Sequence, residues 1–314
     1  MLHANKRTFK VLSFNTWLLK TPFGFSIAEH VDARAQLIPS AIATLNPDII
    51  SLQEVWSTEH RDQLIRDFQK LGYPYAAFRA DTNTLLNPLE IVRAKFGNGL
   101  LIISKYEIHS EVLQLRFQTH TRADERAVIK GAILARILVP GLGWMDFFNS
   151  HLGAVTFDKH SHEYYPKHIR NRFAQAQELS HFLLTHKKND FCIGALDLDG
   201  HYHVYEKGNY TGKLSDDYHL FTSQEKGMDF IDVHRHVHGI DNTPHWTFDK
   251  KNPYVSGGYF SHAPNEVIDY IFVNRNQKII PVHSEIVFQE PQGREKPHML
   301  SDHYGVLATF EIRS

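Results

Sequence analysis

Five short polar clusters, each ending or interrupting an apolar run, constrain the fold more than any other feature of the chain. They are spread over most of its length: Phe14-Asn15-Thr16, Gln53-Glu54, Ser150-His151-Leu152, Leu196-Asp197-Leu198-Asp199 and Ser301-Asp302-His303. A short apolar run bounded by polar residues is typical of a buried strand. One such cluster alone is adequately explained as a polar strand end. Five of them favour a fold in which several strand ends meet and form a polar site.

Strand and helix patterns alternate in the first part of the chain. A capping box, Ser26-x-x-Glu29, marks the start of the first helix. The predicted elements are, in order, a strand at 10–14, a helix from Ser26 to just before Pro47, a strand at 48–52 and a helix from Thr58 to Gly72.

The rest of the chain is richer in predicted strands. They lie at 99–104, 112–117, 132–139, 145–149, 190–196, 267–273, 284–288 and 305–312, and one long helix opens at Pro166. No repeat or linker pattern interrupts this series. We therefore expect residues 1–314 to form a single α/β (α+β) domain in which two packed sheets are flanked by helices.

The composition is that of an ordinary globular protein, with 42% hydrophobic and 22% charged residues. The formal net charge of −1 gives no bulk attraction to nucleic acid or to anionic lipid, which argues against a nucleic-acid partner. Cys192 is the single cysteine, so an intrachain disulfide is excluded. No apolar stretch reaches about 20 residues, and no signal-peptide pattern is present. We expect a monomer without a transmembrane segment that is cytoplasmic, or exported without a cleaved signal peptide.

The clusters belong to a longer ordered series that resembles the endonuclease/exonuclease/phosphatase superfamily. The matching segments are Leu12–Trp17, Leu52–Val55, Gly97–Leu100, Asn149–Leu152, Asp269–Phe272 and Ser301–Tyr304. The resemblance covers residues 10 to 312. It implies a deoxyribonuclease-I-like fold, which is a four-layer α/β/β/α sandwich of two packed mixed β-sheets flanked by helices.

Within this superfamily the chain is most similar to the neutral sphingomyelinases, which are phospholipases of the C type. The resemblance rests on Lys130-Gly131 at the start of a strand, on Arg172 to Glu178, and on Pro264 to Phe272. It implies Mg²⁺-dependent hydrolysis of sphingomyelin to ceramide and phosphocholine. The substrate would then be a phospholipid at a membrane surface, with peripheral membrane contact by the protein.

The expected metal ligands follow from the charge of a phosphodiester. Its oxygens are negative, so a divalent metal ion must neutralise charge and polarise the P–O bond. Glu54 is the first candidate ligand, Asp302 adds a carboxylate, and Asn15 would supply an amide oxygen directly or through water. Mg²⁺ is the expected ion, with Mn²⁺ as the alternative.

His303 is the candidate general base, with the adjacent Asp302 orienting its imidazole. By resemblance, His151 would donate a hydrogen bond to a non-bridging phosphate oxygen, and Asp269 would lie beside His151 and set its tautomer. The expected phosphate-binding residues are Asn15, Lys130 and Asp199.

The segment Leu196-Asp197-Leu198-Asp199 departs from the Gly-Asp-x-Asn pattern of the family. In the family, the Asp positions the nucleophile or protonates the leaving group, and the Asn holds phosphate. We align Asp197 with that Asp, because the alternative register that keeps Gly194 replaces the carboxylate by Ala195. Asp199 then takes the Asn position, where a second negative charge repels phosphate unless a metal ion or a proton compensates.

The chain has 22 histidines, and three of them alternate at His234, His236 and His238. On a strand this spacing would place them on one face, where they could hold zinc. Because no cysteine cluster supports a zinc site, we favour exposed polar histidines.

Two apolar stretches, Thr82–Phe96 and Tyr254–Phe260, could contact a lipid surface, and packed loops over the core are the alternative. Other substrates of the superfamily also stay open, namely DNA, RNA, an inositol phosphate or another phospholipid. A further alternative is a non-catalytic binding protein on the same fold, which the altered segment around Asp197 suggests.

Overall fold

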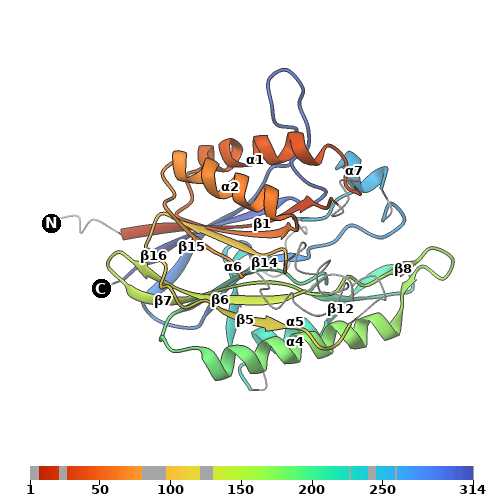
Figure 1. Cartoon of the computed structure of the whole chain (residues 1–314). Coiled ribbons are helices and arrows are strands. Elements are labelled where there is room, and N and C mark those ends of the chain that lie inside the picture. The colour runs from red at the N-terminus through yellow and green to blue at the C-terminus, as the bar shows by residue number, and fades with distance from the viewer. Residues whose placement is uncertain are drawn as a thin grey trace, which may run out of the picture.

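Two mixed β-sheets packed face to face, with helices on both outer faces, form the body of the protein (Figure 1). The computed structural model describes residues 7–20, 27–79, 97–120, 130–225, 228–239, 245–258 and 260–313. This arrangement confirms the predicted four-layer α/β/β/α sandwich.

The first sheet has the strand order β15-β16-β1-β2-β4-β3. Its strands are β1 (Arg7–Leu18), β2 (Ile49–Val55), β3 (Tyr75–Ala77), β4 (Leu101–Ser104), β15 (Ile279–Val287) and β16 (Gly305–Ile312). Helices α1 (Val31–Leu45) and α2 (Thr58–Lys70) cover its outer face (Figure 1). Fully buried side chains such as Leu12, Ile38 and Leu64 pack between this sheet and its helices.

The second sheet has the strand order β13-β14-β10-β7-β6-β5. Its strands are β5 (Leu113–Arg116), β6 (Gly131–Val139), β7 (Gly143–His151), β10 (Cys192–Asp197), β13 (Phe230–Asp232) and β14 (Asp269–Asn274). Helices α4 (Pro166–His186) and α5 (Asp216–Thr222) cover its outer face (Figure 1). Leu179, Leu196 and Phe221 are fully buried in the apolar layer between them.

A third apolar layer fills the space between the sheets, with Val11, Ile133, Ile193 and Val306 among its buried members. The remaining elements are short and lie outside the two large sheets. They are β8 (Phe157–Asp158), β9 (Glu163–Tyr164), β11 (His203–Glu206), β12 (Asn209–Leu214), α6 (Val233–His238) and α7 (Pro253–Ser256).

Strand direction explains why the polar clusters share one edge. Among the described strands, each sheet has one parallel pair, β1 with β2 and β7 with β10. The ends of β1 and β10 meet, since Asn15 donates to Asp197, so the carboxyl ends of all four strands lie at one edge. The neighbours β16 and β14 run antiparallel to them and therefore begin at that edge. In the register of the second sheet, Asp197 lies opposite both His151 and Asp269.

The first helix begins later than its capping box predicts. α1 starts at Val31, and its N-cap is His30 in a left-handed conformation with no side-chain cap. Ser26 lies outside the described residues, and Ile27, just after it, is 63% exposed. The capping-box boundary is therefore wrong, and the chain enters the helix through a left-handed residue instead.

The alternating histidines lie on a helix and not on a strand, which corrects the strand interpretation. β13 ends at Asp232, whose side chain accepts a hydrogen bond from the backbone N–H of Arg235 and caps α6. Helical spacing places His234 and His238 on one face because they are four residues apart. His236 points to another face and is exposed.

None of the helices in the described parts of the chain has the length and hydropathy needed to cross a bilayer. Of the two stretches considered for lipid contact, Thr82–Phe96 lies outside the described residues. In the other stretch, Tyr254 and Val255 are buried, and the Tyr254 ring packs 5.3 Å from the ring of Trp17. This packing favours the core-loop alternative for the stretch around Tyr254.

Candidate active site

The polar strand ends meet at one edge, where the amide of Asn15 joins the two sheets. Asn15 Nδ2, near the end of β1, donates to Glu54 Oε1 over 3.1 Å and to Asp197 Oδ2 of the second sheet over 2.8 Å. Both Asn15 and Asp197 are fully buried. The structure brings all the predicted site residues into this network: Asn15, Glu54, Lys130, His151, Asp197, Asp199, Asp269, Asp302 and His303.

His303 pairs with a carboxylate from the second sheet and not with its sequence neighbour. Its Nδ1 atom lies 3.0 Å from Asp269 Oδ2, whereas Asp302 Oδ1 lies 4.0 Å from Nε2. Asp302 was expected to orient the ring, and Asp269 was expected beside His151, so both pairings are corrected. The cause is the register of β14 against β10, which sets Asp269 at the centre of the edge where the segment before β16 arrives.

Three carboxylates surround the imidazole of His303 and control its protonation. Burial alone would lower the pKa of His303, but the negative charges of Asp269, Asp302 and Asp197 outweigh burial and raise it well above its ordinary value. The imidazolium form is therefore stabilised. The basicity of the ring depends on what neutralises these carboxylates.

Lys130 supplies positive charge beside the Asp199 carboxylate. Lys130 Nζ lies 3.0 Å from Asp199 Oδ2 and donates to the carbonyl of Leu152 over 2.6 Å. His151 Nε2 lies 2.9 Å from both Lys130 Nζ and Asp199 Oδ2. An ammonium group only donates and a carboxylate only accepts, so Nε2 satisfies one of them at a time.

Asp197 and Asp199, the two aspartates at the end of β10, have opposite shifts in pKa. Burial disfavours the charged form of Asp199, but Lys130 and His151 outweigh burial and lower its pKa. For Asp197, burial and the neighbouring carboxylates of Asp199 and Asp269 raise the pKa to about 7. A carboxyl group that holds a proton near neutral pH can act as a general acid.

Glu54 and Asp302 form a pair of acidic groups suited to a hard divalent cation. Glu54 has a left-handed backbone with φ of 58°, and Trp56 Nε1 donates to its Oε2 over 3.2 Å. Burial raises the pKa of Asp302 to about 6, against the opposing effect of His303, and the Glu54 carboxylate adds to the rise. A divalent cation held by these oxygens would relieve their mutual repulsion, so the donor set fits Mg²⁺.

The amide of Asn15 is oriented with its nitrogen toward the acidic groups. Its Oδ1 accepts from the backbone N–H of Trp17 over 2.9 Å, while Nδ2 donates to Glu54 and Asp197. In this orientation Asn15 holds the carboxylates in place and does not present its amide oxygen to them.

A buried amide pair behind the site was not among the predicted site residues. Gln53 Nε2 donates to Asn149 Oδ1 over 2.9 Å, and Asn149 Nδ2 donates to the carbonyl of Leu52 over 2.8 Å. Both amide side chains are fully buried and tie β2 to β7 across the two sheets. The available signal was a polar residue inside an otherwise apolar strand.

Arg34 is the second feature that sequence reasoning missed. Its guanidinium is fully buried and donates to the carbonyls of Thr16 and Leu300 over 2.7 and 2.9 Å, and to that of Trp17 over 2.7 Å. Arg34 thus joins the end of β1 to the segment that carries Asp302. The available signal was an arginine on the apolar face of a predicted helix.

Solved structures with similar folds support this architecture. Beta toxin from Staphylococcus aureus is 21% identical, with 96% of this chain and 99% of that chain covered and a TM-score of 0.70. Sphingomyelinase C from Streptomyces griseocarneus is 19% identical, with 98% and 100% covered and a TM-score of 0.66. TDP2 from D. rerio is 16% identical, with 96% and 98% covered and a TM-score of 0.65. A further beta toxin structure contains bound magnesium ions.

Sequence comparison gives the family directly. No curated protein sequence matches this chain significantly. The family model described as the Endonuclease/Exonuclease/phosphatase family matches residues 12–303, which include every predicted site residue. This match spans most of the chain and includes the edge where those residues meet, so the chain belongs to the Endonuclease/Exonuclease/phosphatase family.

Proposed function

We propose that this protein is a Mg²⁺-dependent phosphodiester hydrolase that acts as one catalytic domain and cleaves sphingomyelin to ceramide and phosphocholine. The observation that carries the proposal is the contact between His303 Nδ1 and Asp269 Oδ2 at 3.0 Å, beside the acidic pair of Glu54 and Asp302. A carboxylate-braced imidazole next to a cation site is the arrangement that metal-assisted hydrolysis requires.

His303 acts as the general base in this mechanism when a cation held by Glu54 and Asp302 offsets the carboxylates that otherwise stabilise its imidazolium form. With Nδ1 bonded to Asp269, its Nε2 takes a proton from the attacking water as the oxygen–phosphorus bond forms. The Asp269 carboxylate stabilises the imidazolium that results. A Mg²⁺ ion held by Glu54 and Asp302 supplies charge neutralisation on the phosphate oxygens when it is bound.

Asp197 and the pair of Lys130 and His151 act on the other groups of the phosphodiester. Asp197, with its pKa raised to about 7, donates a proton to the leaving oxygen as the phosphorus–oxygen bond breaks. Lys130 and His151 present positive charge and an N–H donor to the non-bridging oxygens. The phosphate then competes with Asp199 for these two donors, and that competition would slow the reaction.

Sphingomyelin is preferred over other phosphodiesters on two grounds. The sequence resembles the neutral sphingomyelinases at Lys130-Gly131 and from Pro264 to Phe272, and a sphingomyelinase C has the same fold. The formal net charge of −1 provides no general attraction to nucleic acid.

The test is phosphocholine release from sphingomyelin liposomes with purified protein and Mg²⁺. We expect Mg²⁺-dependent release that His303→Ala abolishes. His181→Ala is the matched control, because His181 is exposed on α4, on the outer face of the second sheet. Phosphatidylcholine liposomes, single-stranded and duplex DNA, and inositol phosphates complete the substrate panel.

The panel separates the levels of the proposal. Mg²⁺-dependent cleavage of DNA or inositol phosphate without cleavage of sphingomyelin would reject the lipid substrate and keep the hydrolase. Failure on every ester by folded, Mg²⁺-loaded protein would reject the hydrolase itself and leave a binding role.

A further inference from the structure

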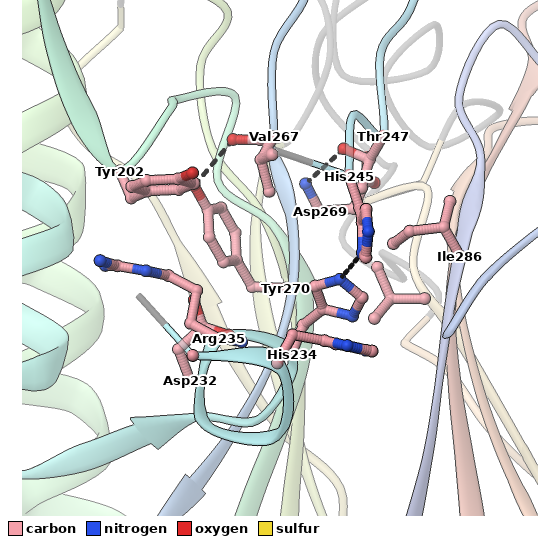
Figure 2. A pocket seen from close by; sticks show the side chains of 13 residues that line it. Tyr202, Asp232, His234, Arg235, His245, Thr247, Val267, Asp269, Tyr270 and Ile286 are labelled. Atoms are coloured by element: carbon pink, nitrogen blue, oxygen red, sulfur yellow. Dashed lines mark hydrogen bonds between the residues drawn. The ribbon is translucent and has the colours of Figure 1, made fainter. Parts of the chain in front are cut away.

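Three histidines form a cluster outside the catalytic network. His234 and His238 come from α6, and His245 comes from the segment that leads to Thr247. Their ring centroids are 4.5, 5.0 and 5.1 Å apart, which is a nearly equilateral triangle. One ring nitrogen from each lies within 4.8 Å of the other two. Figure 2 shows His234 and His245 joined by a hydrogen bond between their ring nitrogens, in a pocket that Asp269 also lines.

The two facing nitrogens share a hydrogen bond that a metal ion can replace. His234 Nε2 and His245 Nδ1 lie 2.8 Å apart, so one of them carries a proton and the other a lone pair. Two nitrogens bound tetrahedrally to zinc, each at about 2.0–2.1 Å, are roughly 3.3 Å apart. The rings therefore need to separate by only about half an ångström. His245 is exposed, so its side chain has room to make that shift.

The outer nitrogens of the cluster are held by one residue of the first sheet. His234 Nδ1 lies 2.9 Å from Ser284 Oγ, and His238 Nε2 lies 2.7 Å from the carbonyl oxygen of Ser284 on β15. A carbonyl oxygen only accepts, so the neutral His238 ring carries its proton on Nε2. Hydrogen bonds of this kind fix ring orientation in metal sites and raise the basicity of the ligand.

The position of the cluster gives it a structural role beside the active site. α6 follows β13, an edge strand of the second sheet, and its histidines bind Ser284 of β15, an edge strand of the first. Two residues after His245, Thr247 Oγ1 accepts from the backbone N–H groups of Ile268 and Asp269 over 3.0 and 3.2 Å. An ion on the cluster would therefore link both sheets to the segment that holds Asp269.

We propose that His234, His238 and His245 form a second metal site, which binds one divalent transition-metal ion such as Zn²⁺ and leaves a coordination position open to solvent. The ligand chemistry selects the ion. Three imidazoles suit zinc and its neighbours, whereas Mg²⁺ prefers oxygen ligands. The ion ties α6 to the segment after His245 and stabilises the folded protein.

The binding test uses the whole protein and Zn²⁺ in competition with a chromogenic chelator. We expect the His234→Ala/His245→Ala double variant to bind Zn²⁺ at least about tenfold more weakly than the unaltered protein. The matched control is His236→Ala, on the same helix but exposed and outside the cluster. It should keep the affinity of the unaltered protein. Equal affinity in the double variant and the unaltered protein would overturn the proposal.

Two further measurements separate this site from the catalytic edge. Co²⁺ in place of Zn²⁺ should give the visible absorption of a four-coordinate ion in the unaltered protein and lose it in the double variant. Glu54→Gln and His303→Ala should keep this absorption, because neither residue belongs to the cluster. Loss of the absorption in His303→Ala, with retention in the double variant, would place the ion at the catalytic edge and reject the second site. These readouts do not depend on turnover, so they hold even if the proposed hydrolase activity fails.

Discussion

The catalytic edge and the histidine cluster lie on two sides of Asp269 and differ in ligand chemistry. The catalytic edge brings together buried carboxylates, with pKa values of about 6 for Asp302 and about 7 for Asp197. The cluster has three imidazoles and is partly exposed. Repulsion between buried carboxylates favours a hard, doubly charged ion, whereas neutral imidazoles favour a borderline ion. Neighbouring sites in one fold can thus select different metals through ligand type alone.

The largest expected effect is on kcat, and it distinguishes His303 at the catalytic edge from His236, which lies on α6 next to the histidine cluster. His303→Ala should lower kcat by about 10³-fold, because it removes the general base. His236→Ala, on the exposed face of α6, should change kcat by less than about twofold. Turnover of sphingomyelin liposomes in Mg²⁺ measures both. Equal kcat values for the two variants would show that His303 is not the base.

The next effect distinguishes the two aspartates beside His303. Asp269→Asn should lower kcat by about 10²-fold, because the amide cannot stabilise the imidazolium at Nδ1. Asp302→Asn should chiefly raise the Mg²⁺ concentration needed for half-maximal rate, since Asp302 is the proposed ion ligand and lies 4.0 Å from Nε2. Rates measured across a Mg²⁺ titration separate these outcomes, and a reversed pattern would restore Asp302 as the orienting residue.

A smaller effect concerns the charge that compensates Asp199. Lys130→Met should destabilise the protein by about 3 kcal/mol, because it removes the ammonium partner of the partly buried Asp199 carboxylate and leaves only His151 beside it. Asp199→Asn in the same chain should recover part of that loss, since it removes the poorly compensated charge. Urea denaturation of the four proteins of this cycle measures the coupling. Additive effects would mean that Lys130 and Asp199 do not depend on each other.

The smallest expected effect is a pH dependence of Mg²⁺ affinity. Asp302 has its pKa raised to about 6, so a proton competes with the ion below that pH and is absent above it. Affinity should therefore fall about tenfold between about pH 7 and about pH 5. Calorimetric titration with Mg²⁺ at several pH values measures the change. As a control, the Asp302→Asn variant should bind Zn²⁺ at the histidine cluster as the unaltered protein does, because Asp302 is not part of that cluster.

Local patterns predicted most of the elements, and together with the family resemblance they named the residues that meet at the catalytic edge, although not their pairing. Glu54, His151 and Asp197 follow apolar strands, and these strands do end at one edge. The prediction failed where the cue was weak. The alternating histidines around residue 236 have the spacing of a strand, but they lie on a helix whose N-terminus is capped by the side chain of Asp232.

Arg34 and Asn149 show why the supporting residues were harder to find. Each is a polar residue in an apolar pattern, which the sequence presents as an exception without naming a partner. Their partners, such as Leu300 for Arg34 and Gln53 for Asn149, lie 266 and 96 residues away in the chain. Buried polar groups need such partners, and only the folded chain supplies them.

The sequence by itself determined the strands, their polar ends and the family, because apolar periodicity and local motifs act over a few residues. The tertiary structure alone decided which charges meet. His303 pairs with Asp269, 34 residues away, and Lys130 pairs with Asp199, 69 residues away. Sheet register makes these contacts, and register depends on packing across the whole domain.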